Sequence, residues 1–211
     1  ETSICVMRGL TQTSFGQSKS HDTWIKPSSA VLGDVDGDRH SDVVAVVSGA
    51  SAVAILYGKA DSSLEKPVQY TVGPAPTAVT LSDWNGDGRP DLVVADEGGL
   101  STFQNMGERA WGPRFTVSTP PFVRRVLNVD WNDDGKDDLL AIAPSHEVTA
   151  ILSRGDGRFE TSALANSLGA YDAAVADFNQ DGRPDIAISE TDRPLARVFL
   201  LDGVFCAHAI Q

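Results

Sequence analysis

The acidic segment Asp83-Trp-Asn85-Gly-Asp87-Gly-Arg89-Pro-Asp91 decides the fold class, because it occurs four times at a nearly constant spacing. Each copy places Asp or Asn at positions 1, 3, 5 and 9 of a nine-residue loop. The first aspartates are 49, 47 and 47 residues apart, which indicates an internal structural repeat. In chain order, loops one, three and four are Asp34-Val-Asp36-Gly-Asp38-Arg-His40-Ser-Asp42, Asp130-Trp-Asn132-Asp-Asp134-Gly-Lys136-Asp-Asp138 and Asp177-Phe-Asn179-Gln-Asp181-Gly-Arg183-Pro-Asp185.

The residue types in these loops predict calcium sites. Calcium is a hard cation that takes about six to eight oxygen ligands from carboxylates, amide oxygens, main-chain carbonyls and water. Positions 1, 3, 5 and 9 supply four side chains, and the main-chain carbonyl at position 7 is the natural fifth ligand. The sequence therefore predicts up to four Ca²⁺ ions, with His40, Arg89, Lys136 and Arg183 acting through their carbonyls. The predicted ligands are Asp34, Asp36, Asp38, His40, Asp42, Asp83, Asn85, Asp87, Arg89, Asp91, Asp130, Asn132, Asp134, Lys136, Asp138, Asp177, Asn179, Asp181, Arg183 and Asp185.

An EF-hand loop opens with the same acidic pattern, but it needs a bidentate Glu at position 12 and a helix on each side. In this chain position 12 is apolar in every copy, as Ala45, Val94, Ala141 and Ile188. Magnesium is disfavoured because it resists dehydration and rarely occupies an all-protein cage. One such cluster could be a solvated turn, but four copies in register favour metal binding.

Loop one departs from the other three at position 6. The others have Gly88, Gly135 and Gly182 there, whereas loop one has Arg39. Glycine is favoured where the backbone needs a positive φ angle. We therefore expect a left-handed backbone at position 6, and we expect loop one to bind calcium with altered geometry or less tightly.

Composition and charge exclude some functions. The chain has 211 residues, compatible with one domain, and no apolar run approaches the roughly 18 residues of a membrane span. Its formal net charge of −12 argues against a nucleic-acid partner, because such binding needs clustered Lys and Arg. Thirteen of the 29 acidic residues lie at the predicted ligand positions, so the loops concentrate like charge.

The calcium prediction also favours a secreted or extracellular protein, since calcium is abundant outside cells. The two cysteines, Cys5 and Cys206, lie near opposite ends of the chain, where a disulfide would join the termini. Two separate buried thiols fit the sequence equally well, because free cysteine is often buried.

Apolar stretches flank the acidic loops and predict strands. Ala78–Ser82 precedes loop two and Leu92–Ala95 follows it, and such short runs rich in Val and Leu suit buried strands. A third strand is expected at Ala52–Tyr57, Leu100–Gln104, Val148–Leu152 and Ala196–Leu201. A fourth, less regular strand is expected at Val68–Val72, Phe115–Val117, Phe159–Leu164 and Phe205–Ile210. Four short strands per repeat are typical of propeller blades.

The N-terminal residues fit the same repeat, because Ser3–Gly9 matches Ala52–Gly58 in pattern and in distance to the next acidic loop. The sequence thus predicts a single all-β domain, a β-propeller of four-stranded antiparallel blades. Full blades are expected at 27–73, 74–119, 120–166 and 167–211, after an N-terminal outer half blade at 1–26. The propeller ring could close in three ways. A longer chain could supply further blades, a second chain could supply them, or the ring could be small with one incomplete blade.

The chain resembles the FG-GAP/VCBS repeat family, which includes integrin α-subunit propellers and many secreted bacterial and fungal proteins. The resemblance rests on Asp83–Ala95, on Asp177–Ala187 and on the Gly-Asp-Gly turn of Arg154–Phe159. It implies calcium-binding loops within the blades of a β-propeller. Arg39 and the divergent turn at Gly107–Phe115 depart from the family pattern.

The resemblance, together with the lack of a nucleophile–base–acid pattern, favours a recognition module with structural calcium. The expected ligand is carbohydrate or glycoprotein, bound in a lectin-like or adhesive role. The alternatives are a secreted polysaccharide lyase or hydrolase, the non-catalytic propeller of one, or a structural piece of a larger adhesin or toxin. A calcium-bound Asp is a poor general acid because the ion keeps it ionised.

Aromatic residues at position 2 of three loops, Trp84, Trp131 and Phe178, are expected to pack between neighbouring blades. Trp24 and Trp111 lie in less regular segments. These two are the better candidates for an exposed binding surface.

Overall fold

The computed structural model describes residues 3–7, 9–11, 14–22, 26–47, 49–145, 147–165, 170–190, 196–201 and 207–210. Every secondary-structure element in this part of the chain is a β-strand. No helix among these residues is long and apolar enough to cross a membrane. Four antiparallel sheets of four strands form the body, which confirms the prediction of an all-β fold built from such sheets.

The four sheets follow one another along the chain, and in each the strands lie side by side in chain order. The first sheet contains β5 (Pro27–Gly33), β6 (Asp42–Val47), β7 (Ala52–Leu56) and β8 (Val68–Thr71). The second contains β9 (Ala78–Ser82), β10 (Asp91–Asp96), β11 (Gly99–Gly107) and β12 (Ala110–Val117). The third contains β13 (Arg125–Val129), β14 (Asp138–Ile142), β15 (Val148–Ser153) and β16 (Phe159–Ala165). The fourth contains β17 (Ala170–Ala176), β18 (Asp185–Glu190), β19 (Ala196–Leu201) and β20 (Ala207–Ile210).

The chain begins with a long hairpin that precedes the first sheet. β1 (Ser3–Val6) pairs with β4 (Lys19–Asp22), and β2 (Gly9–Thr11) pairs with β3 (Ser14–Phe15). We call β1 to β4 the N-terminal hairpin. Ile4 packs against the buried side chains of the first sheet, so the hairpin rests on that sheet. Its assignment as an outer half blade stays a prediction.

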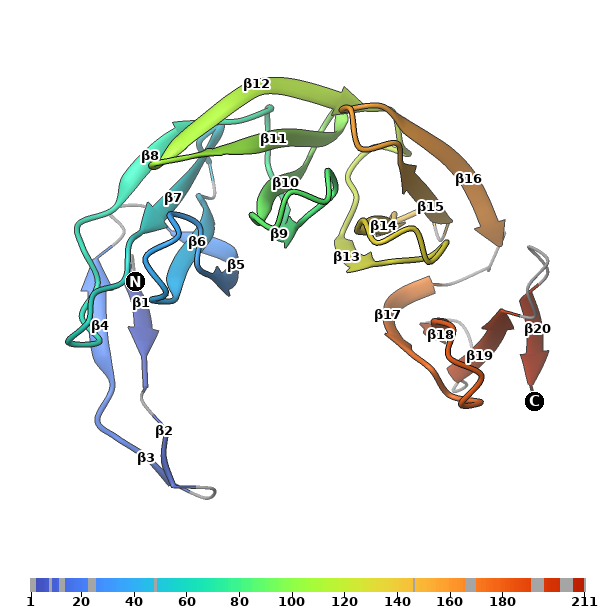
Figure 1. The fold of residues 1–211 in the computed structure, drawn as a ribbon, viewed down its shortest axis with the longest axis horizontal. Helices are drawn as coiled ribbons and strands as arrows, with labels where there is room; N and C mark the ends of the chain where they lie inside the picture. Colours follow the sequence, from blue (N-terminus) through green and yellow to red (C-terminus); the bar gives the residue numbers. More distant parts are fainter. Residues whose placement is uncertain are drawn as a thin grey trace.

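The four sheets are arranged around an arc (Figure 1). The first strands, β5, β9, β13 and β17, lie on the inner side, where those of neighbouring sheets contact one another. The fourth strands β8, β12, β16 and β20 lie on the outer side. The N-terminal hairpin is at one end and the fourth sheet at the other, and the described residues trace an open arc rather than a closed ring.

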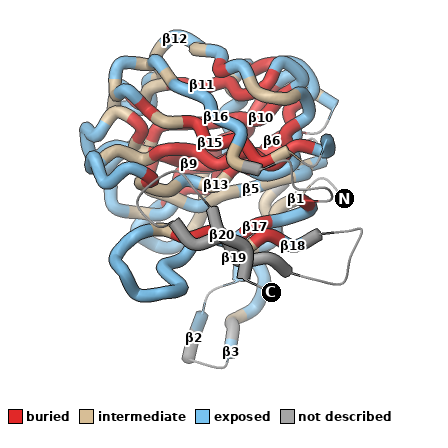
Figure 2. The backbone as a smooth tube through the Cα atoms, turned by 90° about the vertical axis from the view of Figure 1, so that its right-hand side faces the viewer, coloured by how far each residue is buried: buried red, intermediate tan, exposed pale blue. Residues whose placement is uncertain are grey.

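The core lies between neighbouring sheets, which explains the continuous apolar runs in the central strands. In β10, Leu92 and Val94 belong to the cluster shared with the first sheet, whereas Val93 and Ala95 belong to the cluster shared with the third. Successive side chains of a strand point to opposite faces, so a strand covered on both faces is apolar throughout. Figure 2 shows the buried segments running through the stacked sheets, with exposed residues on outer strands such as β12.

Candidate metal sites

The acidic loops each join the first two strands of a sheet, and they fold around the aspartate at position 1. In loop two, Asp83 Oδ1 accepts a hydrogen bond from the backbone N–H of Asp87 at 3.0 Å, and Oδ2 accepts one from Gly88 at 2.8 Å. Asp130 and Asp177 accept the equivalent pairs of hydrogen bonds from positions 5 and 6 of their own loops. The first carboxylate therefore closes each of these loops.

The side chains at positions 3 and 5 form further turns, which direct their oxygens into the loop. Asn85 Oδ1 accepts the N–H of Asp87 at 2.8 Å, and Asp87 Oδ1 accepts the N–H of Arg89 at 3.0 Å. Loops three and four repeat both hydrogen bonds. Loop one repeats them with Asp36 and Asp38. The structure thus brings the predicted side-chain ligands of positions 1, 3 and 5 together on one turn in every loop.

Two positions in each loop have a left-handed backbone. Position 6 has φ angles of 69° at Arg39, 83° at Gly88, 79° at Gly135 and 86° at Gly182, which confirms the prediction of a positive φ there. Position 4 is also left-handed, and the sequence did not reveal it. Its φ angles are 85° at Gly37, 72° at Gly86, 57° at Asp133 and 61° at Gln180. A residue other than glycine costs roughly 1–2 kcal/mol in this region, so each loop stores some backbone strain or uses glycine to avoid it.

The aspartate at position 9 is buried in the sheet and not exposed on the turn. The four are Asp42, Asp91, Asp138 and Asp185, each at most 1 % exposed. Asp138 accepts hydrogen bonds from the N–H of Trp131 at 3.0 Å, in its own loop, and from the N–H of Ser153 at 2.7 Å, at the end of the third strand. Asp42 accepts the two equivalent hydrogen bonds in the first sheet. This carboxylate therefore ties the acidic loop to the third strand of its sheet.

The carboxylate of Asp91 tests whether these residues suit a cation. Its Oδ1 accepts the N–H of Asn105 at 2.7 Å, but its Oδ2 is buried without a hydrogen-bond partner. Burial, with the charges of Asp87 and Asp83 nearby, raises the pKa of Asp91 to about 7. A buried carboxylate oxygen is costly unless it is paired or bound to a metal. The oxygen donors of loop two therefore fit a hard divalent cation.

Loop one brings three carboxylates close enough to share one ion. One oxygen each of Asp34, Asp36 and Asp42 lies within 4.8 Å of the others. Ligands on opposite sides of one calcium ion lie roughly 5 Å apart, so the cluster has a suitable size. Arg109, in the turn between β11 and β12, also reaches this loop, with its guanidinium 2.9 Å from Asp36 and 3.0 Å from Glu65. The negative charge of loop one is therefore partly neutralised by the guanidinium of Arg109, which belongs to the second sheet.

In loops two and three the side chain at position 7 lies beside the carboxylate at position 5. Arg89 is 2.5 Å from Asp87, and Lys136 is 3.1 Å from Asp134. The basic side chain thus offsets part of the loop charge from outside. The main-chain carbonyl of position 7 as a ligand stays a prediction, in loops one to four alike.

Side chains of the third strands connect neighbouring loops. The Ser153 hydroxyl donates to the carbonyl of Trp84 in loop two at 2.6 Å, and the Asn105 amide donates to the carbonyl of Val35 in loop one at 2.8 Å. The backbone N–H of each donates to the position 9 aspartate of its own sheet. Each of these residues therefore connects the acidic loop of its own sheet to the loop before it.

Asp137 gives loops two and three a second connection. Its carboxylate accepts the N–H of Asp83 at 2.8 Å, and its own N–H donates to the carbonyl of Asp83 at 3.1 Å. The side chain of Asn128 also donates to the Asp137 carboxylate, at 3.3 Å. An acidic residue outside the predicted ligand set thereby fixes the distance between two loops.

The aromatic residues at position 2 do not all behave alike. Trp84 lies edge to face between Phe115 of the second sheet and Phe159 of the third, with ring centroids 6.5 and 5.6 Å away. Trp131 is buried in the core between the third and fourth sheets. The expectation of packing between sheets is therefore confirmed for these two tryptophans. It is wrong for Phe178, which is 47 % exposed.

Two further expectations from the sequence concern the exposure of Trp111 and of Cys5. Trp111 is partly buried against Tyr70 and the core between the first two sheets, so it is a weaker candidate for a binding surface than its sequence context indicates. Cys5 is exposed, which contradicts a buried thiol at that position. Trp24 and Cys206 lie outside the described residues, so their roles stay predictions.

Comparison with solved structures agrees with this fold. A lectin from Agrocybe aegerita, described as recognising non-reducing terminal N-acetylglucosamine, is similar with a TM-score of 0.69 and 14 % identity. The match covers 100 % of this chain and 60 % of the lectin chain, and at this identity it shows the fold alone. The V. cholerae biofilm matrix protein Bap1 is similar with a TM-score of 0.49 and 17 % identity, over 91 % of this chain and 28 % of that one. The comparison with curated proteins found no match.

A comparison with protein families gives a more specific result. The family model of FG-GAP-like repeats matches residues 34–94 and 130–188, more than half of the chain. Each matched range starts at the first aspartate of an acidic loop and contains two such loops. The matched residues include the left-handed turns and buried position 9 aspartates described above. This chain belongs to the FG-GAP-like repeat family.

Proposed function

We propose that this chain is a calcium-stabilised recognition module of the β-propeller type, which binds carbohydrate or glycoprotein outside the cell. The observation that carries the proposal is the fold, which is similar over the whole chain to a lectin that recognises terminal N-acetylglucosamine. Membership of the FG-GAP-like repeat family and the arc of four similar sheets support the same class. The role would be lectin-like or adhesive.

Calcium would be held by the side chains of positions 1, 3, 5 and 9 with the carbonyl of position 7. The partnerless Oδ2 of Asp91 and the three carboxylates of loop one support this assignment. When bound, the ion supplies the positive charge that offsets these buried and clustered carboxylates. The same side chains hold the loop amides, so the expected role of the metal is to fix the hairpins and not to perform chemistry.

Further sheets would close the arc into a ring. The chain spans 60 % of the length of the lectin chain that it resembles, and the described residues leave the arc open. The additional sheets could belong to a longer form of this chain or to a second chain. Light scattering after gel filtration tests the second source: a stable dimer of the 211-residue chain supports it, and a monomer contradicts it.

A glycan array in calcium-containing buffer tests the recognition role. Binding of defined glycans or glycoproteins without turnover is the expected result. Release of unsaturated or reducing sugar ends from a bound polysaccharide would instead support the alternative, a secreted lyase or hydrolase. Failure to bind any glycan or glycoprotein, with the fold intact, would contradict the proposal.

A further inference from the structure

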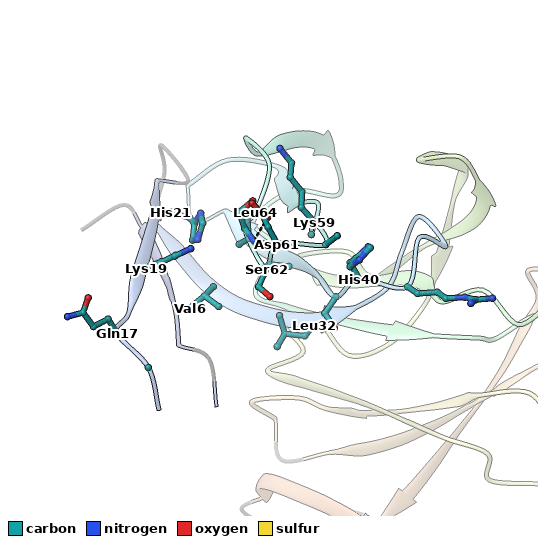
Figure 3. A pocket seen from close by; sticks show the side chains of 17 residues that line it. Val6, Gln17, Lys19, His21, Leu32, His40, Lys59, Asp61, Ser62 and Leu64 are labelled. Atoms are coloured by element: carbon teal, nitrogen blue, oxygen red, sulfur yellow. Dashed lines mark hydrogen bonds between the residues drawn. The ribbon is translucent and has the colours of Figure 1, made fainter. Parts of the chain in front are cut away.

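A cavity of about 770 Å³ lies between the N-terminal hairpin and the first sheet (Figure 3). Its volume falls within the range of roughly 300–1,000 Å³ that is typical of ligand sites. Its walls come from β4, from residues 39–41 of loop one and from residues 58–64 between β7 and β8. The cavity shares residues 39–41 with loop one, including the predicted carbonyl ligand His40, but none of the predicted carboxylate ligands of the acidic loops lines it.

The charge of this cavity differs from that of the rest of the chain. Lys19, Arg39 and Lys59 line it, and the imidazoles of His21 and His40 add two more polar groups. Only one acidic residue is among the described residues that line it. The whole chain, in contrast, has 29 acidic residues against 17 Lys and Arg. The cavity is therefore a basic site on an acidic protein.

The one acidic residue, Asp61, already has its own partners. Asp61 Oδ1 accepts hydrogen bonds from the N–H of Ser63 at 2.9 Å and from the Ser63 hydroxyl at 2.5 Å. These hydrogen bonds lower the pKa of Asp61, and the charges of Lys19 and Lys59 lower it as well. Lys19 belongs to the hairpin and Lys59 to the turn after β7, so the cavity is lined by one lysine from each of these two parts of the fold.

The wall that carries Lys59 is a well-defined turn. The N–H of Lys59 donates to the carbonyl of Ser63 at 2.9 Å, and the N–H of Ser62 donates to the carbonyl of Lys59 at 2.8 Å. A β-bridge between Gly58 and Leu64 closes the base of this turn. A wall formed before binding lowers the ordering cost that a ligand must overcome.

Apolar side chains lie beside these charges. Leu32 is 67 % exposed although it lies on a strand of the first sheet, and it lines the cavity together with Val6 and Leu64. Figure 3 shows these three side chains around the same space as Lys19 and His21. Ligand sites commonly combine an apolar wall with a few polar groups that fix orientation. A saccharide that carries an acidic group matches both the apolar wall and the basic groups of the cavity, because its ring C–H face is apolar and its substituent is anionic.

We infer that this cavity binds an acidic saccharide, and that Lys19 and Lys59 hold its carboxylate or sulfate group. The saccharide part of this inference rests on the proposed function, whereas the anionic part rests on the lining charges. Charge-assisted hydrogen bonds from lysine to an anionic oxygen are stronger than neutral ones, so the acidic group would dominate selectivity. Binding should weaken with added salt, because the lysines are exposed.

Titration calorimetry in calcium-containing buffer tests the inference with three tetrasaccharides. The probes are an unsulfated hyaluronan tetrasaccharide, a chondroitin sulfate tetrasaccharide and neutral chitotetraose. The double variant Lys19→Gln/Lys59→Gln removes two positive charges from the cavity. The control, Lys26→Gln/Lys66→Gln, removes two from exposed positions that do not line it. We expect the acidic probes to bind at least tenfold more weakly to the cavity variant and unchanged to the control.

The outcomes separate this inference from the proposed function. Acidic probes that bind the cavity variant as tightly as the parent would overturn the inference. Binding of chitotetraose alone would also overturn it, while the recognition role would stand. Binding of none of the three probes by the parent would overturn the inference, whereas only the glycan array decides the recognition role. A preference for the sulfated or the carboxylated probe that is lost in the cavity variant would support the inference and identify the anionic group. Melting curves check that each variant is folded.

Discussion

At the scale of single residues, the position 9 aspartates have two different hydrogen-bonding environments. Asp138 shows the first, because its two oxygens accept backbone hydrogen bonds from two different segments. Asp91 shows the second, because one of its oxygens is buried and free of such bonds. Burial raises the pKa of Asp42, Asp91 and Asp138, so the fold holds these carboxylates at an electrostatic cost. A bound cation would remove that cost.

This cost predicts a pH dependence for the calcium-free protein. Asp91 has a raised pKa of about 7 in the folded state, against the ordinary aspartate value of 3.8. The folded protein therefore holds this proton more tightly than the unfolded chain, and the stabilising effect is complete below about pH 4 and lost as the pH rises through 7. We expect the urea midpoint in a chelator to fall from about pH 5 to about pH 8. Asp91→Asn should flatten the change, and a midpoint that rises over this range would contradict the assignment.

A second prediction concerns the metal ligands themselves. Asp87→Ala removes the position 5 carboxylate of loop two, so we expect one calcium ion fewer per chain and a weaker hairpin. Calorimetry and metal analysis measure the stoichiometry. Asp156→Ala is the control, because this exposed carboxylate lies outside the acidic loops. An unchanged stoichiometry in Asp87→Ala would show that loop two does not use this ligand.

A third prediction concerns the left-handed positions. Gly88 has a φ angle of 83°, and a Cβ atom added there would meet nothing within 4 Å. Gly88→Ala therefore isolates the backbone cost, which should lower the free energy of unfolding by roughly 1–2 kcal/mol. Gly9 also has open space, but its φ angle is not positive, so Gly9→Ala is the matched control and should change stability little. Equal effects of the two substitutions in urea unfolding would argue against the conformational explanation.

At the scale of elements, burial on both faces decides which strands the sequence reveals. β9 and β19 have the predicted bounds, Ala78–Ser82 and Ala196–Leu201. β12 instead starts at Ala110, five residues before the predicted Phe115, because this outer strand is half exposed and lacks a continuous apolar run. The β2–β3 pair in the N-terminal hairpin was also missed. Apolar runs mark covered strands, and outer strands carry a weaker signal.

The loops were predictable for a different reason, since their ligand pattern and spacing are explicit in the sequence. Position 6 was recognised because three loops have glycine there. Position 4 was missed because Asp133 and Gln180 occupy it in two loops and give no sign of a positive φ. The contacts between loops were also hidden, because Asn105 and Val35 are 70 residues apart and only the packing of sheets brings them together.

A fourth prediction tests the contact between sheets. Ser153→Ala removes the hydroxyl that donates to the buried carbonyl of Trp84, so that carbonyl loses a partner. An unsatisfied buried polar group costs about 1–3 kcal/mol, and we expect a loss of stability of that size in urea unfolding. Ser162→Ala, at an exposed position of β16, is the control and should have little effect. Equal stabilities of the two variants would mean that this contact between sheets contributes little.

At the scale of the whole molecule, charge and packing act in opposite directions. Apolar clusters between neighbouring sheets hold the arc together, from the first sheet to the fourth. The net charge of −12 opposes compaction, and four calcium ions would offset two thirds of it. Ring closure could not be predicted from the sequence, because each repeat specifies its contact with the next sheet but not how many sheets complete the circle.

Thermal unfolding with and without calcium tests the central claim that the acidic loops bind calcium and thereby stabilise the repeated sheets. A single site filled at 100 times its Kd adds about 2.7 kcal/mol. For a chain of this size each kcal/mol raises the Tm by roughly 2–4 °C. We therefore predict a Tm several degrees higher in calcium than in a chelator, with magnesium at the same concentration giving a smaller rise. An unchanged Tm on calcium removal would contradict the account.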